Sequence, residues 1–184
     1  MQFEAPSGYP LGTNKTFKYA AAILIPILNV LTKREWRGAE NLPKSGPVIV
    51  ISNHLSYVDA LVFAHFLYGN GRAVRYLGKD SVFKIPILGK IIASSGQIPV
   101  ARESDKASHA LDSALGLLQV GHCVGIYPEG TLTRDPKLWP MVAKTGIARL
   151  AIISKAPVIP IAQWGDQNLL APYSKKVVLW RRTK

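Results

Sequence analysis

Short apolar runs alternate along the chain with longer stretches in which apolar residues recur at helical spacing. The strand-like runs, each rich in β-branched or aliphatic residues, are residues 48–52, 73–77, 98–100, 123–127 and 158–163. The clearest helical stretches are residues 58–68, 105–120 and 145–154. Strands that alternate with helices in this way predict an α/β domain with a largely parallel central sheet flanked by helices.

Polar residues follow three of the strand-like runs and are candidates for one shared site. His54, Arg102 and Glu129 each come after such a run. Ligands of parallel α/β sheets bind beyond the carboxyl ends of the strands. We therefore expect these three side chains to converge on one edge of the sheet.

His54 and Asp59 form a candidate base pair. Two residues five apart in a continuous helix lie about 140° apart and do not face each other. If His54 lies on the loop before the helix and Asp59 in its first turn, the carboxylate reaches the imidazole, fixes one tautomer and makes a general base. The alternative is a surface histidine near an aspartate that favours the helix dipole. The helix that begins here has its apolar positions at Val58, Leu61, Val62 and Phe66.

The apolar stretch of residues 17–31 predicts a short N-terminal membrane-associating helix. It contains only Lys18 and Asn29 as strongly polar residues, is interrupted by Pro26, and is shorter than the roughly 20 residues that a spanning helix needs. We expect an interfacial helix, kinked at Pro26; a core-packed helix is the alternative. The flanking cations that would meet lipid headgroups are Lys15, Lys18, Lys33, Arg34 and Arg37. The expected organisation is a mobile lead-in over residues 1–16, this helix within residues 17–35, and one domain over residues 36–184.

Composition narrows the range of partners. The 184 residues carry 23 Lys and Arg against 11 Asp and Glu, a formal charge of +12, which implies an anionic partner. The basic residues are scattered and no nucleic-acid-binding motif is present, so an anionic membrane or a phosphorylated substrate is favoured over nucleic acid. The single cysteine, Cys123, lies in a strand-like run and predicts a buried structural thiol and a reducing compartment. Four scattered histidines do not indicate a metal site.

Two motifs in order give the chain a family resemblance. Asn53-His54 followed by Asp59, and residues 127–131 (Tyr-Pro-Glu-Gly-Thr) further on, resemble the glycerolipid acyltransferases, of which 1-acylglycerol-3-phosphate acyltransferase is typical. The resemblance extends over residues 36–164. It implies that His54, oriented by Asp59, is the base for direct attack of a lipid hydroxyl on an acyl thioester, without an acyl-enzyme. A serine nucleophile beside His54 is set aside because the chain has no Gly-x-Ser-x-Gly elbow.

The resemblance also implies a set of substrate-binding residues. Arg102 corresponds to the arginine that binds the acceptor phosphate, and a guanidinium suits that task because it donates two parallel hydrogen bonds. Lys144, at the start of a helix, adds charge for the same phosphate. Residues 129–131 would position the glycerol. The complete set of expected substrate-binding residues is Asn53, Arg102, Glu129, Gly130, Thr131, Arg134 and Lys144.

One position departs from the family pattern. The family has an arginine directly after the threonine that corresponds to Thr131, whereas here Leu132 occupies that place and Arg134 follows two residues later. Either Arg134 replaces the missing arginine, or Lys144 and Arg102 alone bind the phosphate. The departure bears on acceptor identity more than on the reaction.

The resemblance implies transfer of a fatty acyl group to lysophosphatidic acid, giving phosphatidic acid in phospholipid biosynthesis. The donor would be acyl-CoA or acyl-carrier protein as a co-substrate, with no cofactor and no metal. The expected location is the cytoplasmic face of the cell membrane, as a peripheral or monotopic protein. Two alternatives remain open: another lysophospholipid or a glycolipid as acceptor, or a catalytically silent protein that binds anionic lipids. Relatives generally continue beyond the last strand, so we expect that the chain is either a fragment or a short member.

Overall fold

The computed structural model describes residues 3–100, 104–174 and 176–178. Its centre is a five-stranded sheet in the order β3-β2-β4-β1-β5, and every neighbouring pair of strands is parallel. The predicted α/β architecture with a parallel central sheet is confirmed. The elements in chain order are α1 (Lys15–Leu31), η1 (Ala39–Asn41), β1 (Val48–Ser52), α2 (Asp59–Gly69), β2 (Val74–Lys79), α3 (Asp80–Phe83), α4 (Leu88–Ser94), β3 (Ile98–Val100), α5 (Ser104–Gln119), β4 (Cys123–Ile126), α6 (Gly146–Ser154), β5 (Val158–Ile161) and α7 (Asp166–Leu169).

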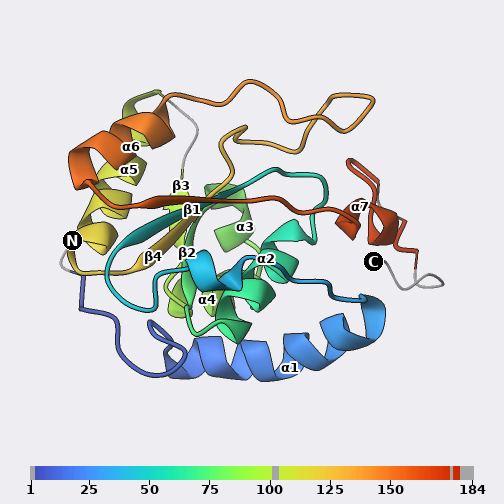
Figure 1. Cartoon of the computed structure of the whole chain (residues 1–184), viewed down its shortest axis with the longest axis horizontal. Coiled ribbons are helices and arrows are strands. Elements are labelled where there is room, and N and C mark those ends of the chain that lie inside the picture. Colours follow the sequence, from blue (N-terminus) through green and yellow to red (C-terminus); the bar gives the residue numbers. More distant parts are fainter. Residues whose placement is uncertain (1–2, 101–103, 175, 179–184) are drawn as a thin grey trace.

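The sheet is covered on both faces, because successive strand residues point to opposite sides. Ile49 and Val124 pack toward α5 and α6, in a cluster completed by Ala114, Leu117, Leu118 and Leu150. Val48, Val50 and Cys123 point the other way and pack with Phe63 and Leu67 of α2. Figure 1 shows the resulting layers, with α1 running along the outside of α2.

The apolar face expected for α2 differs from the one observed. Leu61 is exposed, and the buried positions are Asp59, Phe63, His65 and Leu67. The helix is apolar around most of its circumference, so periodicity alone did not indicate which side faces the sheet.

The segment before α1 contacts the sheet, and the mobility expected for residues 1–16 stays a prediction. Leu11 forms a β-bridge with Arg72, and the Gly12 carbonyl accepts a hydrogen bond from the buried guanidinium of Arg75 at 2.7 Å. The Glu4 carbonyl contacts His122 Nε2 at 2.9 Å. These polar contacts hold the segment against the N-terminal end of the sheet.

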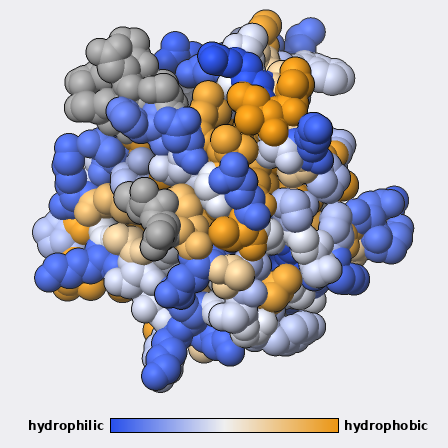
Figure 2. All heavy atoms as spheres, turned by 90° about the vertical axis from the view of Figure 1, so that its left-hand side faces the viewer, coloured by the Kyte–Doolittle hydropathy of each residue, from blue (hydrophilic) through white to orange (hydrophobic). Residues whose placement is uncertain are grey.

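α1 is a continuous helix that contains Pro26. Asn14 caps its N-terminus by accepting a hydrogen bond from the Phe17 N–H at 2.8 Å. Among the residues that the structure describes, no helix combines the length and apolarity needed to cross a membrane. Figure 2 faces the side on which α5 and α6 lie, where apolar atoms reach the surface among hydrophilic side chains.

Candidate active site

The candidate site lies where three neighbouring strands end. β1 is hydrogen-bonded to β4 on one side and to β5 on the other. The residues that follow these strands are His54 after β1, Glu129 after β4 and Gln163 after β5. Parallel strands end at the same edge of a sheet, so the three loops meet there.

His54 lies on the loop before α2, and Asp59 is the first residue of that helix. His54 Nδ1 lies 3.1 Å from Asp59 Oδ2, and the side chains of His54 and Asp59 are 19% and 0% exposed. The placement that the spacing required for a base pair is therefore present. Nδ1 faces the carboxylate, which leaves Nε2 as the atom for proton exchange with a ligand.

The loop that carries His54 folds around the Asp59 carboxylate. Asp59 Oδ2 accepts hydrogen bonds from the backbone N–H groups of Leu55 and Ser56, the latter at 2.9 Å. The Ser56 hydroxyl donates to the Leu170 carbonyl at 2.6 Å, which ties this loop to the end of α7. Donors from the backbone and from His54 therefore converge on one carboxylate oxygen and hold it in place.

An aromatic ring packs against one face of the imidazole. Tyr127 is stacked on His54 with ring centroids 4.1 Å apart and an interplanar angle of 19°. Burial and the negative charge of Asp59 raise the pKa of Tyr127 well above its ordinary value, so its hydroxyl stays neutral. A neutral aromatic face favours an imidazolium above it.

Asn53 connects the β1 loop to the β5 loop. Its side-chain amide donates to the Gln163 carbonyl at 2.9 Å, and its side-chain oxygen accepts from the Gln163 N–H at 2.8 Å. The Gln163 side chain donates to the Ser52 hydroxyl at 2.9 Å. This reciprocal pair fixes the loop that precedes His54, and the expected contact of Asn53 with substrate stays a prediction.

Glu129 is buried and connects the β4 loop to His54. Its Oε1 accepts from the His54 backbone N–H at 3.3 Å, and its Oε2 accepts from the Met141 N–H at 3.0 Å. The Thr133 N–H donates to the His54 carbonyl at 2.8 Å. Both peptide groups of His54 are thus held by the segment after β4, so Glu129 acts on the backbone of the candidate base; its contact with glycerol stays a prediction.

Lys144 crosses the turn at Gly130. Gly130 has a φ of +70°, and a Cβ at this residue would lie 2.9 Å from Lys144 Nζ. Glycine adopts that φ without strain, and its lack of a Cβ lets the Lys144 side chain lie close to the turn. The structure thus brings Lys144 to residues 129–131, where Thr131 is partly buried.

Leu132, which stands where the family has arginine, is 3% exposed and packs inward. Arg134 is exposed, and its backbone N–H contacts Met141 Sδ at 3.5 Å. Arg102 lies outside the described residues. Of the expected phosphate ligands, Lys144 is the one that the structure places against residues 129–131.

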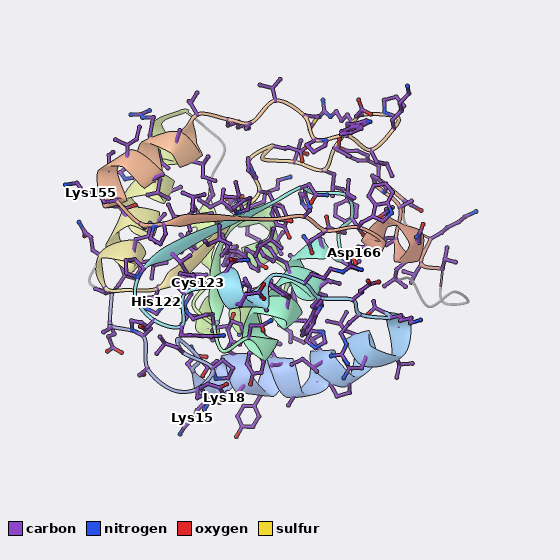
Figure 3. The ribbon with its side chains drawn as sticks, in the orientation of Figure 1. Lys15, Lys18, His122, Cys123, Lys155 and Asp166 are labelled. Atoms are coloured by element: carbon purple, nitrogen blue, oxygen red, sulfur yellow. The ribbon has the colours of Figure 1, made fainter. Side chains whose placement is uncertain are left out.

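The other buried titratable groups lie elsewhere. Burial lowers the pKa of His65, beside Arg34, and of His122, beside Glu4. Burial raises the pKa of Cys123 to about 12 and makes it an inert thiol within the sheet. Figure 3 shows His122 and Cys123 away from Asp166, which begins α7. Among the described residues, no group of three or more acidic, His or Cys side chains is placed to hold a metal ion.

Three residues of the site were not singled out from the sequence. Tyr127 was part of a quoted motif without a role, although its place before Glu129 indicated the same edge of the sheet. Gln163 and Asp166 follow the last strand, and Asp166 is only 6% exposed. A polar residue just beyond a strand was the available signal for both.

The arrangement defines an α/β protein in which a carboxylate-oriented imidazole stands at the carboxyl edge of a parallel sheet, beside a lysine. Such a group can take a proton from a hydroxyl next to an anionic part of the same ligand. The acyltransferase family model matches residues 33–164, and this chain belongs to that family.

Similar proteins share this assignment. A 1-acyl-sn-glycerol-3-phosphate acyltransferase of Borreliella burgdorferi is 30% identical over 132 residues, which cover 71% of this chain and 51% of that protein. A chloroplastic 1-acyl-sn-glycerol-3-phosphate acyltransferase of Brassica napus is 29% identical over 148 residues, covering 79% of this chain and 41% of that protein. The chain therefore spans about half, or less, of the length of these relatives.

A solved structure shares the fold. The crystal structure of the 1-acyl-sn-glycerophosphate (LPA) acyltransferase PlsC from Thermotoga maritima superposes with a TM-score of 0.70 at 23% sequence identity. The match covers 85% of this chain and 63% of that one.

Proposed function

We propose that this chain transfers a fatty acyl group from an acyl thioester to the free hydroxyl of lysophosphatidic acid, which gives phosphatidic acid. The observation that carries the proposal is the contact of 3.1 Å between His54 Nδ1 and Asp59 Oδ2 at the carboxyl edge of the sheet. The names of the similar proteins support lysophosphatidic acid as the acceptor.

In the proposed reaction His54 Nε2 takes the proton of the acceptor hydroxyl as its oxygen attacks the thioester carbonyl. A new ester C–O bond forms and the thioester C–S bond breaks. The imidazolium returns the proton to the leaving thiolate, so no net proton is consumed. Asp59 accepts the hydrogen bond of the Nδ1–H group and stabilises the imidazolium between the two transfers.

The acceptor phosphate is assigned to Lys144, with Arg102 and Arg134 as further candidate ligands. Lys144 supports this assignment because its side chain lies against Gly130, next to the residue whose carboxylate holds the His54 loop. We expect Lys144→Met to raise the KM for lysophosphatidic acid by a larger factor than it lowers kcat, because the lost charge binds the acceptor.

The test is acyl transfer in detergent by the wild type and by His54→Ala. Loss of a positioned base costs about 10²–10⁴-fold in kcat. His109→Ala is the matched control, since His109 is an exposed histidine on α5. Acyl-CoA and acyl-carrier protein are assayed separately as donors. Undiminished turnover by His54→Ala would overturn the mechanism, and turnover only with another lysophospholipid or a glycolipid would replace the acceptor.

A protein that binds anionic lipids without turnover is distinguished by the same pair of variants. Vesicle binding that is unchanged in His54→Ala, together with lost turnover, supports an enzyme. Absence of turnover in both proteins with every donor and acceptor supports the silent binder.

We also propose that α1 lies on the surface of an anionic membrane, at its cytoplasmic face. One face of α1, formed by Phe17, Ala21 and Leu28, is buried. The opposite face is also apolar, although a surface helix normally presents polar residues there. The exposed apolar side chains on α1 are Tyr19, Ile23, Ile27 and Val30.

Neighbouring features extend this surface. α1 packs against α4, and the Asn14 side chain donates to the Ser94 carbonyl at 2.7 Å. Lys15 and Lys18 extend outward from the start of α1 (Figure 3), where they would meet lipid headgroups. Two of the other expected cations contact the protein instead, as Arg34 lies over Trp36 and Arg37 pairs with Glu35. Exposed apolar residues just before and within α4 are Ile85, Ile87, Leu88 and Ile91.

Vesicle sedimentation tests the membrane proposal. We expect Ile23→Ser/Ile27→Ser to weaken binding to vesicles that contain phosphatidic acid, because apolar area no longer enters the interface. Ile152→Ser/Ile153→Ser on α6 is the control, since these two side chains together are more exposed than Ile23 and Ile27. Equal loss of binding in both double variants would refute the proposal that α1 is the membrane-contacting helix.

A further inference from the structure

A second buried carboxyl group lies next to the base pair. Asp166 begins α7, directly after the β5 loop, and is 6% exposed. Asp166 Oδ2 and Asp59 Oδ1 are both buried, and neither receives a hydrogen bond from any donor among the described residues. The other oxygen of Asp59 faces His54 and the backbone donors. Each carboxyl group therefore has one oxygen without a donor.

The surroundings do not neutralise two adjacent carboxylates. Within the described part of the chain, no lysine, arginine or histidine forms an ion pair with Asp166, and His54 is the one such group that contacts Asp59. The other titratable groups beside the pair among the described residues are Tyr127 and Tyr76, and both stay neutral because burial raises the pKa of each hydroxyl well above its ordinary value. Two like charges in contact, away from water, retain a shared proton.

Burial, the negative charge of Asp59 and the hydrogen bond that a protonated Asp166 can donate to Asp59 raise the pKa of Asp166 to about 7. The shift belongs to the pair as a whole, so the two carboxyl groups together hold one proton up to about this pH. Asp59 is the better place for the negative charge, because it accepts the hydrogen bonds of His54, Leu55 and Ser56.

We propose that Asp166 is a positioning residue of the base pair, whose protonated carboxyl group donates a hydrogen bond from Oδ2 to Asp59 Oδ1. This inference rests on the proposed function, in which His54 and Asp59 act as the base. The hydrogen bond stops the Asp59 carboxylate from rotating, so that Oδ2 stays directed at His54 Nδ1. It also keeps a single negative charge beside the imidazole.

Loss of the shared proton reverses both effects. Asp59 Oδ1 then faces a second carboxylate instead of a donor, and the repulsion moves Asp59 away from the orientation that holds His54. We therefore expect turnover to fall as the pH rises through about 7, at a step that Asp166 controls.

Three variants separate this role from a purely structural one. Asp166→Asn keeps a hydrogen-bond donor but does not titrate, and Asp166→Leu has similar bulk without a donor. Asp112→Asn changes an exposed aspartate on α5 and is the matched control. kcat and KM for lysophosphatidic acid are measured from pH 5.5 to pH 9 for each protein.

We expect Asp166→Leu to lose about 10²-fold in kcat with little change in KM, as for a misplaced catalytic group. Asp166→Asn should restore kcat to within about threefold of the wild type at pH 6, and its profile should lack the step near pH 7. Asp112→Asn should keep the wild-type profile. If Asp166→Asn is as impaired as Asp166→Leu at pH 6, or retains the step, the proposal is overturned.

A spectroscopic measurement keeps this inference separate from the proposed function and from folding. The Nδ1–H resonance of His54 is followed by NMR in the wild type and in Asp166→Asn, a measurement that does not require either protein to be active. We expect it to move near pH 7 in the wild type and not in Asp166→Asn. A wild type that lacks acyl transfer but shows this difference would refute the proposed function alone. A resonance that behaves identically in both proteins would refute the role of Asp166.

Discussion

The shared proton of Asp59 and Asp166 makes folding stability depend on pH in a way that one substitution removes. Asp166 has a pKa of about 7 in the folded protein, against 3.8 for an ordinary aspartate. Between these values the unfolded chain has lost the proton that the folded chain still holds. The folded state therefore loses stability as the pH rises through this range, and no further loss occurs above about pH 7.

The size of the effect follows from the two pKa values. Each pH unit between them corresponds to about 1.4 kcal/mol. Between pH 5 and pH 8 the stability changes only from pH 5 to about pH 7, a range of two pH units, because the titration of the folded state ends near pH 7. The wild type should thus lose roughly 3 kcal/mol relative to Asp166→Asn, which does not titrate at this position. Asp166 is only 6% exposed, so solvent screens little of this effect.

Chemical unfolding at pH 5 and at pH 8, followed by tryptophan fluorescence, measures this difference. Taking Asp166→Asn minus wild type at each pH cancels every other titrating group. We expect the unfolding free energy of Asp166→Asn, relative to that of the wild type, to be roughly 3 kcal/mol more favourable to the folded state at pH 8 than at pH 5. Asp112→Asn should show no such change, because the Asp112 side chain is exposed to solvent. A difference for Asp166→Asn that is the same at pH 5 and pH 8 would refute the shared proton.

Two further predictions concern the residues around the site. Glu129→Gln replaces one of the two acceptor oxygens that hold the His54 and Met141 N–H groups, so it should lower the free energy of unfolding by about 1–3 kcal/mol and reduce kcat. Unfolding and turnover are compared with those of Glu40→Gln, which changes an exposed glutamate. Equal effects of the two substitutions would contradict the role of Glu129. Because burial raises the pKa of the Cys123 thiol to about 12, the native protein should resist alkylation at pH 8 and react only when unfolded; rapid labelling of the native protein, detected by mass spectrometry, would show that the thiol is accessible.

The fold was predictable where local pattern and global packing agree. Residues 48–52 and 123–127 are apolar on both alternating sets of positions, which is typical of strands covered by helices on both faces, and β1 and β4 occupy this place. The pattern failed for α2, because an almost wholly apolar helix does not show which of its sides is buried. It also did not indicate the contacts before α1, because contacts such as the one from Arg75 to Gly12 are made by backbone carbonyls, which every residue type carries.

The candidate site likewise has one contact that the sequence predicts and one that it does not. The spacing of His54 and Asp59 predicted their contact because a loop and a helix start impose it locally. Asp166 is 107 positions beyond Asp59 in the chain, and it reaches the pair only because β5 is the neighbour of β1 in the sheet. Strand order is a tertiary property that the periodicity of a strand does not encode.

The strand order also explains how one histidine is held from several directions. β1 is flanked by β4 and β5, so the loop after it can be bonded on both sides. Glu129 holds the His54 N–H from the β4 side, while Gln163 holds Asn53 from the β5 side. A strand at the edge of the sheet would offer one neighbour and one set of such bonds. The position of β1 inside the sheet, rather than the His-Asp spacing alone, therefore supplies the bonds that hold this imidazole in place for its proposed role as a base.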